Sequence, residues 1–461
     1  MTVAGAALSC AAVFWTSYAA GGKANGPRGI PQATQEETAE YAARGRNIVG
    51  ELAAKQFDKV YAQFDQKMAA ALPMEQISHA WDTVIGPAGD FRGIRTVQVE
   101  EHGSLHVARL TCIFAHQVAD VLVTFDAGGR VAGLFFTPAI DTRAVSWAPP
   151  EYKFHEEQIT VSDGQWQLPG TLTLPNGKGP FAAVVLVSGS GPEDEDETIG
   201  PNKPFKDLAW GLASRGISVL RCAKRTKQYG AASITDPKTF TVKDEYIDDA
   251  RAAVALLAAR NDIDAKHIFI AGHSEGGYLA PRIATGDSQI AGIVVLEGNT
   301  RPIQELTLEQ LHYLANLGGP NATQIEKMIP EVEEQVKTID SPDLTTKTNV
   351  RLLSATIPAS YFLDLRGYDP AAVAAKLKIP IFIVQGGRDY QVTTVDFVRW
   401  KRNLAGHENA KLKLYPALNH LLIAGTGASS PAEYAEPGHV SGEVIDDLAA
   451  WIKAQTTGIP R

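Results

Sequence analysis

The chain has only three cysteines among its 461 residues, Cys10, Cys112 and Cys222. They fall in three different segments, so the sequence predicts neither a disulfide framework nor a cysteine-based metal site. It also contains no H-E-x-x-H zinc motif, no glycine-rich phosphate loop and no dinucleotide fingerprint. We therefore expect an activity that needs no metal and no cofactor.

Positive charge is scarce as well. The 43 lysines and arginines stand against 52 aspartates and glutamates, which gives a formal net charge of −9 at pH 7. The basic residues form no stripe along the chain, so neither nucleic acid nor an anionic membrane surface is expected as a partner. The remaining composition, with 44% hydrophobic and 21% charged residues, is typical of a globular protein.

A long apolar run occurs near the start of the chain, at residues 3–20. Ser17-Tyr-Ala19 fits a cleavage site, so we interpret residues 1–25 as an export segment. A signal peptide normally begins with Lys or Arg, whereas the first basic residue here is Lys23. We expect a periplasmic or secreted protein with no membrane span in its mature form; a cytoplasmic location is the alternative.

The length predicts two domains. Within residues 35–140, a capping box at Thr34-Gln-Glu-Glu37 opens an amphipathic helix, and a second helix is expected at 74–84. Alternating strands follow, so this segment is predicted to be a small α+β domain with an accessory role or a role in forming a homodimer. Residues 141–154 are interpreted as a linker to a larger catalytic domain at 155–461.

The larger domain contains a candidate nucleophile, Ser274. A short apolar run that begins at His267 leads into Gly272-His-Ser-Glu-Gly276, and a helix-compatible segment follows at 278–284. This is the G-x-S-x-G pattern between a strand and a helix, the context in which a sharp turn exposes a serine hydroxyl. A tight turn with an incidental serine would produce the same letters, so catalytic partners have to decide between the two interpretations.

A carboxylate and a histidine follow in the order that such a serine requires. Asp389 lies just after the apolar run that begins at Ile379, and His420 lies just after the alternating strand at 411–415. The alternatives are a turn aspartate and a packing histidine. His439, just before the last helix, is a rival base, whereas His407 precedes its strand.

A glycine-rich loop completes the predicted site. The buried strand at 181–187 ends in Ser188-Gly-Ser-Gly-Pro192. A loop of this kind can aim a backbone N–H group at a developing oxyanion, and we assign that N–H to Ser190 with Gly191 as its neighbour. The second donor is expected to be the N–H of Glu275, the residue after the nucleophile.

At these positions the chain resembles the α/β-hydrolase superfamily, and within it the bacterial serine esterases that carry an amino-terminal nuclear-transport-factor-2-like (cystatin-like) domain. The resemblance implies an α/β-hydrolase fold with a mostly parallel, doubly wound sheet, preceded by a smaller, cone-shaped α+β domain. The chain departs from the pattern of these esterases at Glu193 and Glu195, where they often have Asn and Arg, and at Ala223, where they often have Asp. The matching segments are Ser188–Pro192, Asp196–Thr198, Pro201–Asp207, Lys224–Thr226, Gly272–Gly277, Gln385–Gln391 and Asn419–His420.

About 80 residues separate the strand ending at Leu296 from the one beginning at Ile379, where a single crossover helix needs about 15–25. The surplus, about residues 300–366, is predicted to be a helical lid over the nucleophile. Five apolar or aromatic residues in it could line an acyl pocket or form the core of the lid itself: Leu311, Tyr313, Leu314, Tyr361 and Phe362.

Together these features predict a serine hydrolase that cleaves a small-molecule carboxylic ester through an acyl-enzyme intermediate. A serine peptidase of the prolyl-oligopeptidase type shares the order of the triad, but residues 35–140 are too short for a propeller and lack blade repeats. Dienelactone hydrolases carry Cys at the position of Ser274, and haloalkane dehalogenases carry Asp. A non-catalytic binding protein on the same scaffold is the remaining alternative.

Overall fold

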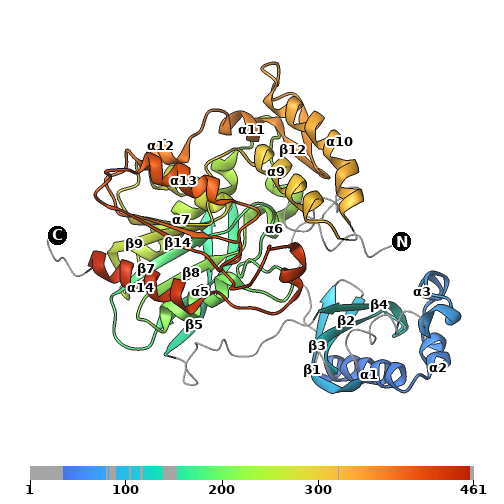
Figure 1. Cartoon of the computed structure of the whole chain (residues 1–461). Coiled ribbons are helices and arrows are strands. Elements are labelled where there is room, and N and C mark those ends of the chain that lie inside the picture. Colours follow the sequence, from blue (N-terminus) through green and yellow to red (C-terminus); the bar gives the residue numbers. More distant parts are fainter. Residues whose placement is uncertain are drawn as a thin grey trace. The chain divides into compact units, whose positions relative to one another are not determined.

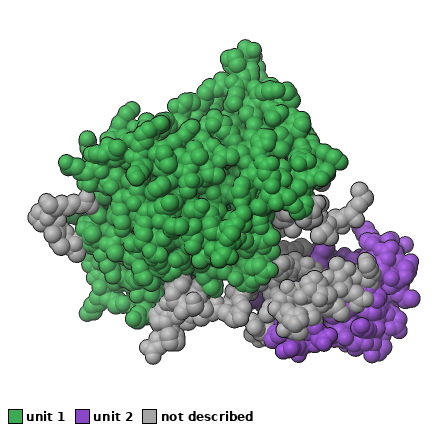
Figure 2. All heavy atoms as spheres, in the orientation of Figure 1, with its two compact units in different colours: residues 1–19, 143–461 green, residues 20–142 purple. Residues whose placement is uncertain are grey.

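The computed structural model describes residues 35–78, 81, 90–102, 105–114, 118–138, 153–319 and 321–456. The chain divides into two compact units, with the boundary between residues 142 and 143 (Figure 2). The predicted export segment and most of the predicted linker lie outside the described residues. No helix in the described part of the chain is both long and apolar enough to span a membrane.

Unit 2, purple in Figure 2, contains an α+β domain. Its four strands pair with their sequence neighbours to form an antiparallel meander in the order β1-β2-β3-β4. Alternate residues of these strands, such as Leu110 and Val123, pack against Ile48 and Leu52 of the first helix. The predicted second helix is described only as far as residue 78. The elements are α1 (Gln35–Ala53), α2 (Phe57–Ala62), α3 (Gln66–Ala71), β1 (Phe91–His102), β2 (Leu105–Phe114), β3 (Val118–Phe125) and β4 (Val131–Pro138).

Unit 1, green in Figure 2, is built on an eight-stranded sheet in the order β14-β13-β10-β9-β7-β8-β6-β5 (Figure 1). The β5–β6 hairpin pairs antiparallel with β8, and all the other strand pairs are parallel. This is the mostly parallel sheet expected for an α/β hydrolase. The strands are β5 (Phe154–Asp163), β6 (Trp166–Pro175), β7 (Phe181–Val187), β8 (Ser218–Cys222), β9 (Ile263–His273), β10 (Ile290–Leu296), β13 (Ile381–Gly386) and β14 (Ala410–Tyr415).

Helices cover both faces of this sheet because successive strand residues point to opposite sides. Val184 packs with α5 and α14, while its neighbour Val185 packs with α7, α8, α12 and α13. The central strands are therefore buried on both faces, which explains their nearly continuous apolar sequences. The helices are α5 (Pro204–Ala213), α6 (Arg225–Tyr229), α7 (Asp248–Ala258), α8 (Glu275–Ala284), α12 (Pro370–Ala374), α13 (Thr394–Asn403) and α14 (Gly442–Thr456).

The segment between β10 and α12 forms an insertion whose helices group together beyond the sheet (Figure 1). Its two longer helices cover the helical runs predicted at 303–316 and 323–338. The structure adds a two-stranded hairpin that the sequence pattern did not indicate, because its strands are only four residues long. The elements are α9 (Ile303–Leu317), α10 (Ala322–Asp340), β11 (Asn349–Leu352), β12 (Ala355–Pro358) and α11 (Ala359–Leu365).

Candidate active site

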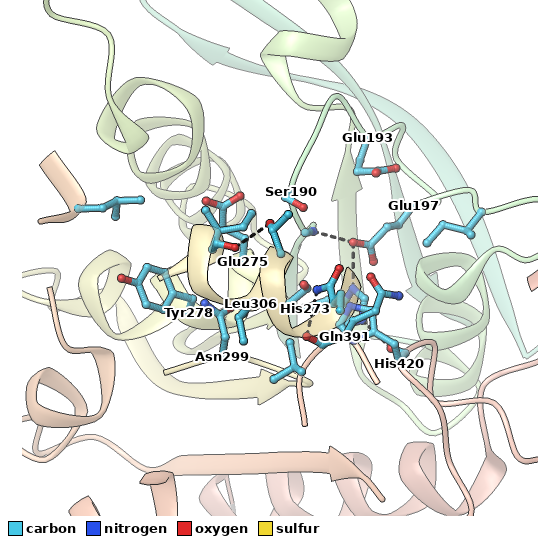
Figure 3. A pocket seen from close by; sticks show the side chains of 18 residues that line it. Ser190, Glu193, Glu197, His273, Glu275, Tyr278, Asn299, Leu306, Gln391 and His420 are labelled. Atoms are coloured by element: carbon cyan, nitrogen blue, oxygen red, sulfur yellow. Dashed lines mark hydrogen bonds and ion pairs between the residues drawn. The ribbon is translucent and has the colours of Figure 1, made fainter. Parts of the chain in front are cut away.

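The carboxyl ends of the parallel strands bring together residues that are far apart in the sequence. Ser274 follows β9, Asp389 follows β13 and His420 follows β14. Ser274 and His420 line one pocket, and Ser190 and Glu275 line it with them (Figure 3). Open α/β sheets place their ligand sites at this edge, where loops can vary without disturbing the core.

Ser274 occupies a strained turn between β9 and α8. Its φ is +52°, a left-handed conformation that is uncommon for residues other than glycine. The turn is tight enough that a Cβ at Gly272 would lie 2.1 Å from the Gly276 carbonyl oxygen. A Cβ at Gly276 would lie 2.2 Å from the carbonyl oxygen of Val187. Both glycines of the motif are therefore required by the close approach of backbone segments.

Asp389 and His420 are in direct contact. Nδ1 of His420 lies 2.7 Å from Oδ2 of Asp389, and both side chains are almost fully buried. The other Asp389 oxygen accepts the backbone N–H groups of Gln391 and Val392, which keeps the carboxylate in place. With Nδ1 donating to the carboxylate, Nε2 of His420 is left as the basic nitrogen.

The two other histidines considered from the sequence have different partners. Nδ1 of His439 lies 3.2 Å from both carboxylate oxygens of Asp207, and a third of its side chain is exposed. Nε2 of His407 lies 2.9 Å from the Leu377 carbonyl oxygen. Neither of them lines the pocket that contains Ser274. The structure thus brings His420 to Asp389 and places His439 elsewhere.

The peptide group between Gly189 and Ser190 is fixed by two hydrogen bonds to its carbonyl oxygen. That oxygen lies 3.1 Å from Lys224 Nζ and 2.8 Å from the Tyr246 hydroxyl. Because the C=O and the N–H of a trans peptide point in opposite directions, the Ser190 N–H points away from Lys224 and Tyr246. The N–H of Glu275, in the first turn of α8, has no acceptor within its own helix. Ser190 and Glu275 both line the pocket that contains Ser274, which is where the sequence predicted the two oxyanion donors.

A second set of contacts fixes the N–H side of the same loop. The Gly189 N–H donates to Oε1 of Glu197 at 2.6 Å, so this N–H is not free to bind an oxyanion. Nδ1 of His273 lies 3.0 Å from the same oxygen, and its Nε2 lies 2.8 Å from the His420 carbonyl oxygen. Burial lowers the pKa of His273, but Glu197 and the other partners raise it more, so the pKa stands above its usual value. Through Glu197 and His273, these contacts link the Ser188–Pro192 loop to the loop that carries His420.

Comparison with known proteins identifies the family to which the chain belongs. Esterase EstD of Thermotoga maritima is 40% identical over 407 residues, which is 88% of this chain and 93% of EstD. The chain belongs to the EstD family of serine esterases. Residues 203–426 also match the α/β-hydrolase family described as "Serine aminopeptidase, S33", and residues 46–134 match a family described as "Protein of unknown function (DUF3887)".

Solved structures similar to the esterase have much lower sequence identity. The Pyrococcus furiosus esterase Pf2001 is 18% identical, covers 68% of this chain and 95% of its own, and gives a TM-score of 0.44. Est1E of Butyrivibrio proteoclasticus is 16% identical, covers 65% of this chain and 98% of its own, and gives a TM-score of 0.42.

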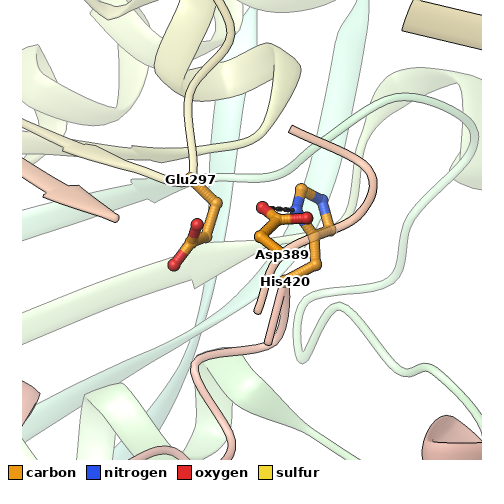
Figure 4. Close-up of side chains that lie close together, drawn as sticks. All are labelled: Glu297, Asp389 and His420. Atoms are coloured by element: carbon orange, nitrogen blue, oxygen red, sulfur yellow. Dashed lines mark hydrogen bonds and ion pairs between the residues drawn. The ribbon is translucent and has the colours of Figure 1, made fainter. Parts of the chain in front are cut away.

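The esterase has a second buried carboxyl group beside Asp389. Figure 4 shows Asp389 between Glu297, which follows β10, and His420. The Glu297 oxygens accept the Gly386 N–H at 2.6 Å and the Gln385 side-chain amide at 2.5 Å. Burial raises the pKa of Glu297 well above its usual value, and the negative charge of Asp389 raises it further. Burial and the neighbouring carboxylate therefore both favour the protonated form of Glu297.

Glu297, Asp389 and His420 have the spacing of a metal site, since their ligand atoms lie within 4.8 Å of one another. Their hydrogen bonds account for this spacing. Nδ1 of His420 donates to Asp389, and both Glu297 oxygens accept bonds from the last two residues of β13. Nothing in the arrangement requires an ion.

We expect the Glu297→Gln variant of the esterase to keep kcat within about tenfold of the wild type at pH 7. Glutamine is a neutral isostere of the protonated acid, and the Gln385 amide can rotate to offer its oxygen to the new NH₂ group. Steady-state kinetics between pH 6 and pH 9 would test this. A loss of more than about a hundredfold at pH 7 would mean that Glu297 takes part in catalysis as a carboxylate.

An apolar chamber adjoins the pocket across Ser190 and Glu275, which line both cavities. Gly191 and two of the five candidate acyl-pocket residues, Tyr361 and Phe362, line this chamber. The other three lie elsewhere: Leu311 and Leu314 are buried in the core of the insertion, and Tyr313 stacks on Tyr390. Other apolar residues of the chamber are Phe240, Ile303, Leu352, Ala355, Ile357 and Pro358.

Several residues that hold the site together could not be assigned from the sequence. Lys224, Glu197 and Gln385 fall inside the segments that carry the family resemblance, but the pattern gave them no role. Their contacts cross between loops of different strands, as when Lys224 reaches Gly189. Tyr246 and Glu297 lie outside those segments. A polar residue next to an apolar run was the sequence signal that could have indicated them, and both are buried in the structure.

Proposed function

We propose that Ser274 is the nucleophile of this esterase, with His420 as its general base and Asp389 as the residue that orients the base. The observation that carries the proposal is the 2.7 Å contact between His420 Nδ1 and Asp389 in the wall of the pocket that also contains Ser274. This contact leaves Nε2 of His420 to accept the serine proton.

In the proposed reaction, Ser274 Oγ attacks the ester carbonyl carbon while Nε2 of His420 takes its proton. The N–H groups of Ser190 and Glu275 stabilise the oxyanion of the tetrahedral intermediate. His420 then protonates the departing alcohol, which leaves an acyl group on Ser274. Water, deprotonated by the same histidine, releases the acid.

The apolar chamber beside Ser190 is proposed to hold the acyl chain, and the insertion is proposed to act as a lid that keeps water from the ester. The aromatic and aliphatic lining of the chamber supports an acyl group of several carbons. A series of p-nitrophenyl esters from acetate to dodecanoate is expected to show kcat/KM rising from acetate to a maximum at intermediate length. A steady fall from acetate onward would contradict an acyl site in this chamber.

A peptidase activity is the second candidate, because residues 203–426 match a family described as a serine aminopeptidase. Aminoacyl-p-nitroanilides assayed beside the esters would separate the two activities. Labelling of Ser274 by a fluorophosphonate probe is expected with either activity, whereas an unlabelled protein would favour a binding role.

Two further proposals rest on the sequence alone. Residues 1–25 are proposed to direct export, and the small α+β domain is proposed to form a homodimer. The mass of the mature chain would show whether residues 1–25 are removed. The molar mass of the protein in solution would show whether it forms a homodimer.

A further inference from the structure

Five consecutive acidic residues, 193–197, follow the Ser188–Pro192 loop. The carboxyl groups of all but one of them accept hydrogen bonds from the protein. Four have hydrogen-bond donors: the backbone of Asp196 and Thr198 for Asp194, Thr171 for Glu195, Arg221 and Lys203 for Asp196, and the Gly189 N–H for Glu197. Among the described residues, no side chain or backbone group donates to the carboxyl group of Glu193.

Glu193 is nevertheless buried, with only 6% of its surface exposed, and it lines the pocket that contains Ser274 (Figure 3). Burial raises the pKa of Glu193 to about 8, with the neighbouring Glu197 as the next cause. A carboxyl group that lines a substrate pocket and has no donor from the described protein is available to accept hydrogen bonds from a ligand.

Glu197 places a second carboxyl group in the wall of the same pocket. Its Oε1 is used by Gly189 and His273, but its Oε2 is buried and has no hydrogen-bond partner. A methyl group placed on Gly189 would lie 3.2 Å from Glu197 Oε1 and 3.6 Å from Ser274 Oγ. Both oxygen atoms therefore lie close to Gly189, which lines the pocket together with Glu197 and Ser274.

We propose that Glu193 and Glu197 form a subsite for the primary ammonium group of an ester substrate whose amine lies within a few bonds of the reacting carbonyl. The inference rests on the proposed esterase chemistry at Ser274 and adds the class of substrate. An ammonium group supplies three donors, enough to reach both carboxyl groups. Charge-assisted bonds of this kind are about twice as strong as neutral ones.

The other charges around Glu193 leave room for such a cation. Glu197 and Asp194 raise the pKa of Glu193, and Lys224 and Lys227 lower it. The Lys224 ammonium is occupied by the Gly189 carbonyl and the Tyr246 hydroxyl, and it lies 3.2 Å from a Glu245 oxygen. His273 Nδ1 lies 3.0 Å from Glu197 Oε1, and this contact leaves the other oxygen of Glu197 without a partner. A bound ammonium would favour ionisation of Glu193, so binding is expected to release a proton.

The test compares alanine ethyl ester with ethyl isobutyrate, which differ only by an ammonium group in place of a methyl group. At about pH 6.5 an α-amino group with a pKa of about 7.7–8.0 is protonated. The ammonium group also activates the ester carbonyl, so the two substrates differ in reactivity even without a subsite. The test is therefore the ratio of kcat/KM for alanine ethyl ester to kcat/KM for ethyl isobutyrate, compared between the wild type and each variant. Glu193→Gln is expected to lower this ratio by about 10- to 100-fold. Glu195→Gln, the same change at a carboxyl group outside the pocket, should leave it unaltered.

A measurement on the wild type does not depend on any variant folding. Isopropylamine should inhibit ethyl isobutyrate hydrolysis at a concentration at least about tenfold lower than isopropanol does. Equal inhibition by the two compounds, or an unchanged substrate ratio in folded Glu193→Gln, would overturn the subsite and leave the esterase assignment intact. A wild type that hydrolyses neither ester would overturn the proposed function itself.

Discussion

Replacing Ser274 with alanine is expected to lower kcat for p-nitrophenyl butyrate by about 10⁴- to 10⁶-fold. Without the hydroxyl no acyl-enzyme can form, and only the polarising effect of the Ser190 and Glu275 N–H groups remains. The fold should not change, because Ser274 is held in its turn by its backbone: its N–H donates to the Leu296 carbonyl at 2.9 Å. Initial rates and thermal unfolding of the same preparation measure both quantities.

Loss of fluorophosphonate labelling in Ser274→Ala is the matching control, since the probe reports the nucleophile independently of the ester. Serine residues elsewhere in the pocket, such as Ser190, would sustain labelling if one of them were the nucleophile. An alanine variant that retains more than about a hundredth of wild-type turnover would contradict the assignment of Ser274.

Replacing His420 with alanine is expected to lower kcat almost as much as the change at Ser274, because the members of a triad act as a unit. His439→Ala should change kcat by less than about threefold. His439 lies against Asp207 at the start of the last helix, and its loss removes a partly exposed ion pair of the kind that contributes little.

The two histidine variants are informative as a pair. A large loss in His439→Ala with little change in His420→Ala would reverse the assignment and would mean that the chain rearranges before it binds substrate. Circular dichroism of both proteins separates a loss of catalysis from a loss of folding.

The sequence predicted the elements of the fold that depend on short-range pattern. Apolar runs of four to seven residues predicted the central strands, because strands buried on both faces are mostly apolar. The G-x-S-x-G pattern predicted the sharp turn, since only glycine fits where Gly272 approaches Gly276. Once strand ends were known, Asp389 and His420 were expected to meet, and their hydrogen bond is part of the structure.

The supporting contacts of the site could not be predicted in this way. Glu297 and Gln385 are 88 positions apart, and Tyr246 and Gly189 are 57 apart. Such contacts depend on how loops from different strands pack against each other. The packing of loops leaves no periodic pattern in a single sequence. The acyl-pocket candidates illustrate the same limit, because a helix pattern cannot tell a residue facing the substrate from one facing a neighbouring helix, as Leu311 does.

The hydrogen bond between Tyr361 and Glu275 has a consequence for protein engineering. Tyr361 belongs to the insertion, and its hydroxyl donates at 3.0 Å to the residue that follows the nucleophile. Exchanging the insertion with that of a relative would leave this acid without one of its donors in an apolar setting. A working chimaera therefore has to carry over the tyrosine with its hydroxyl, or the exchange has to replace both residues together.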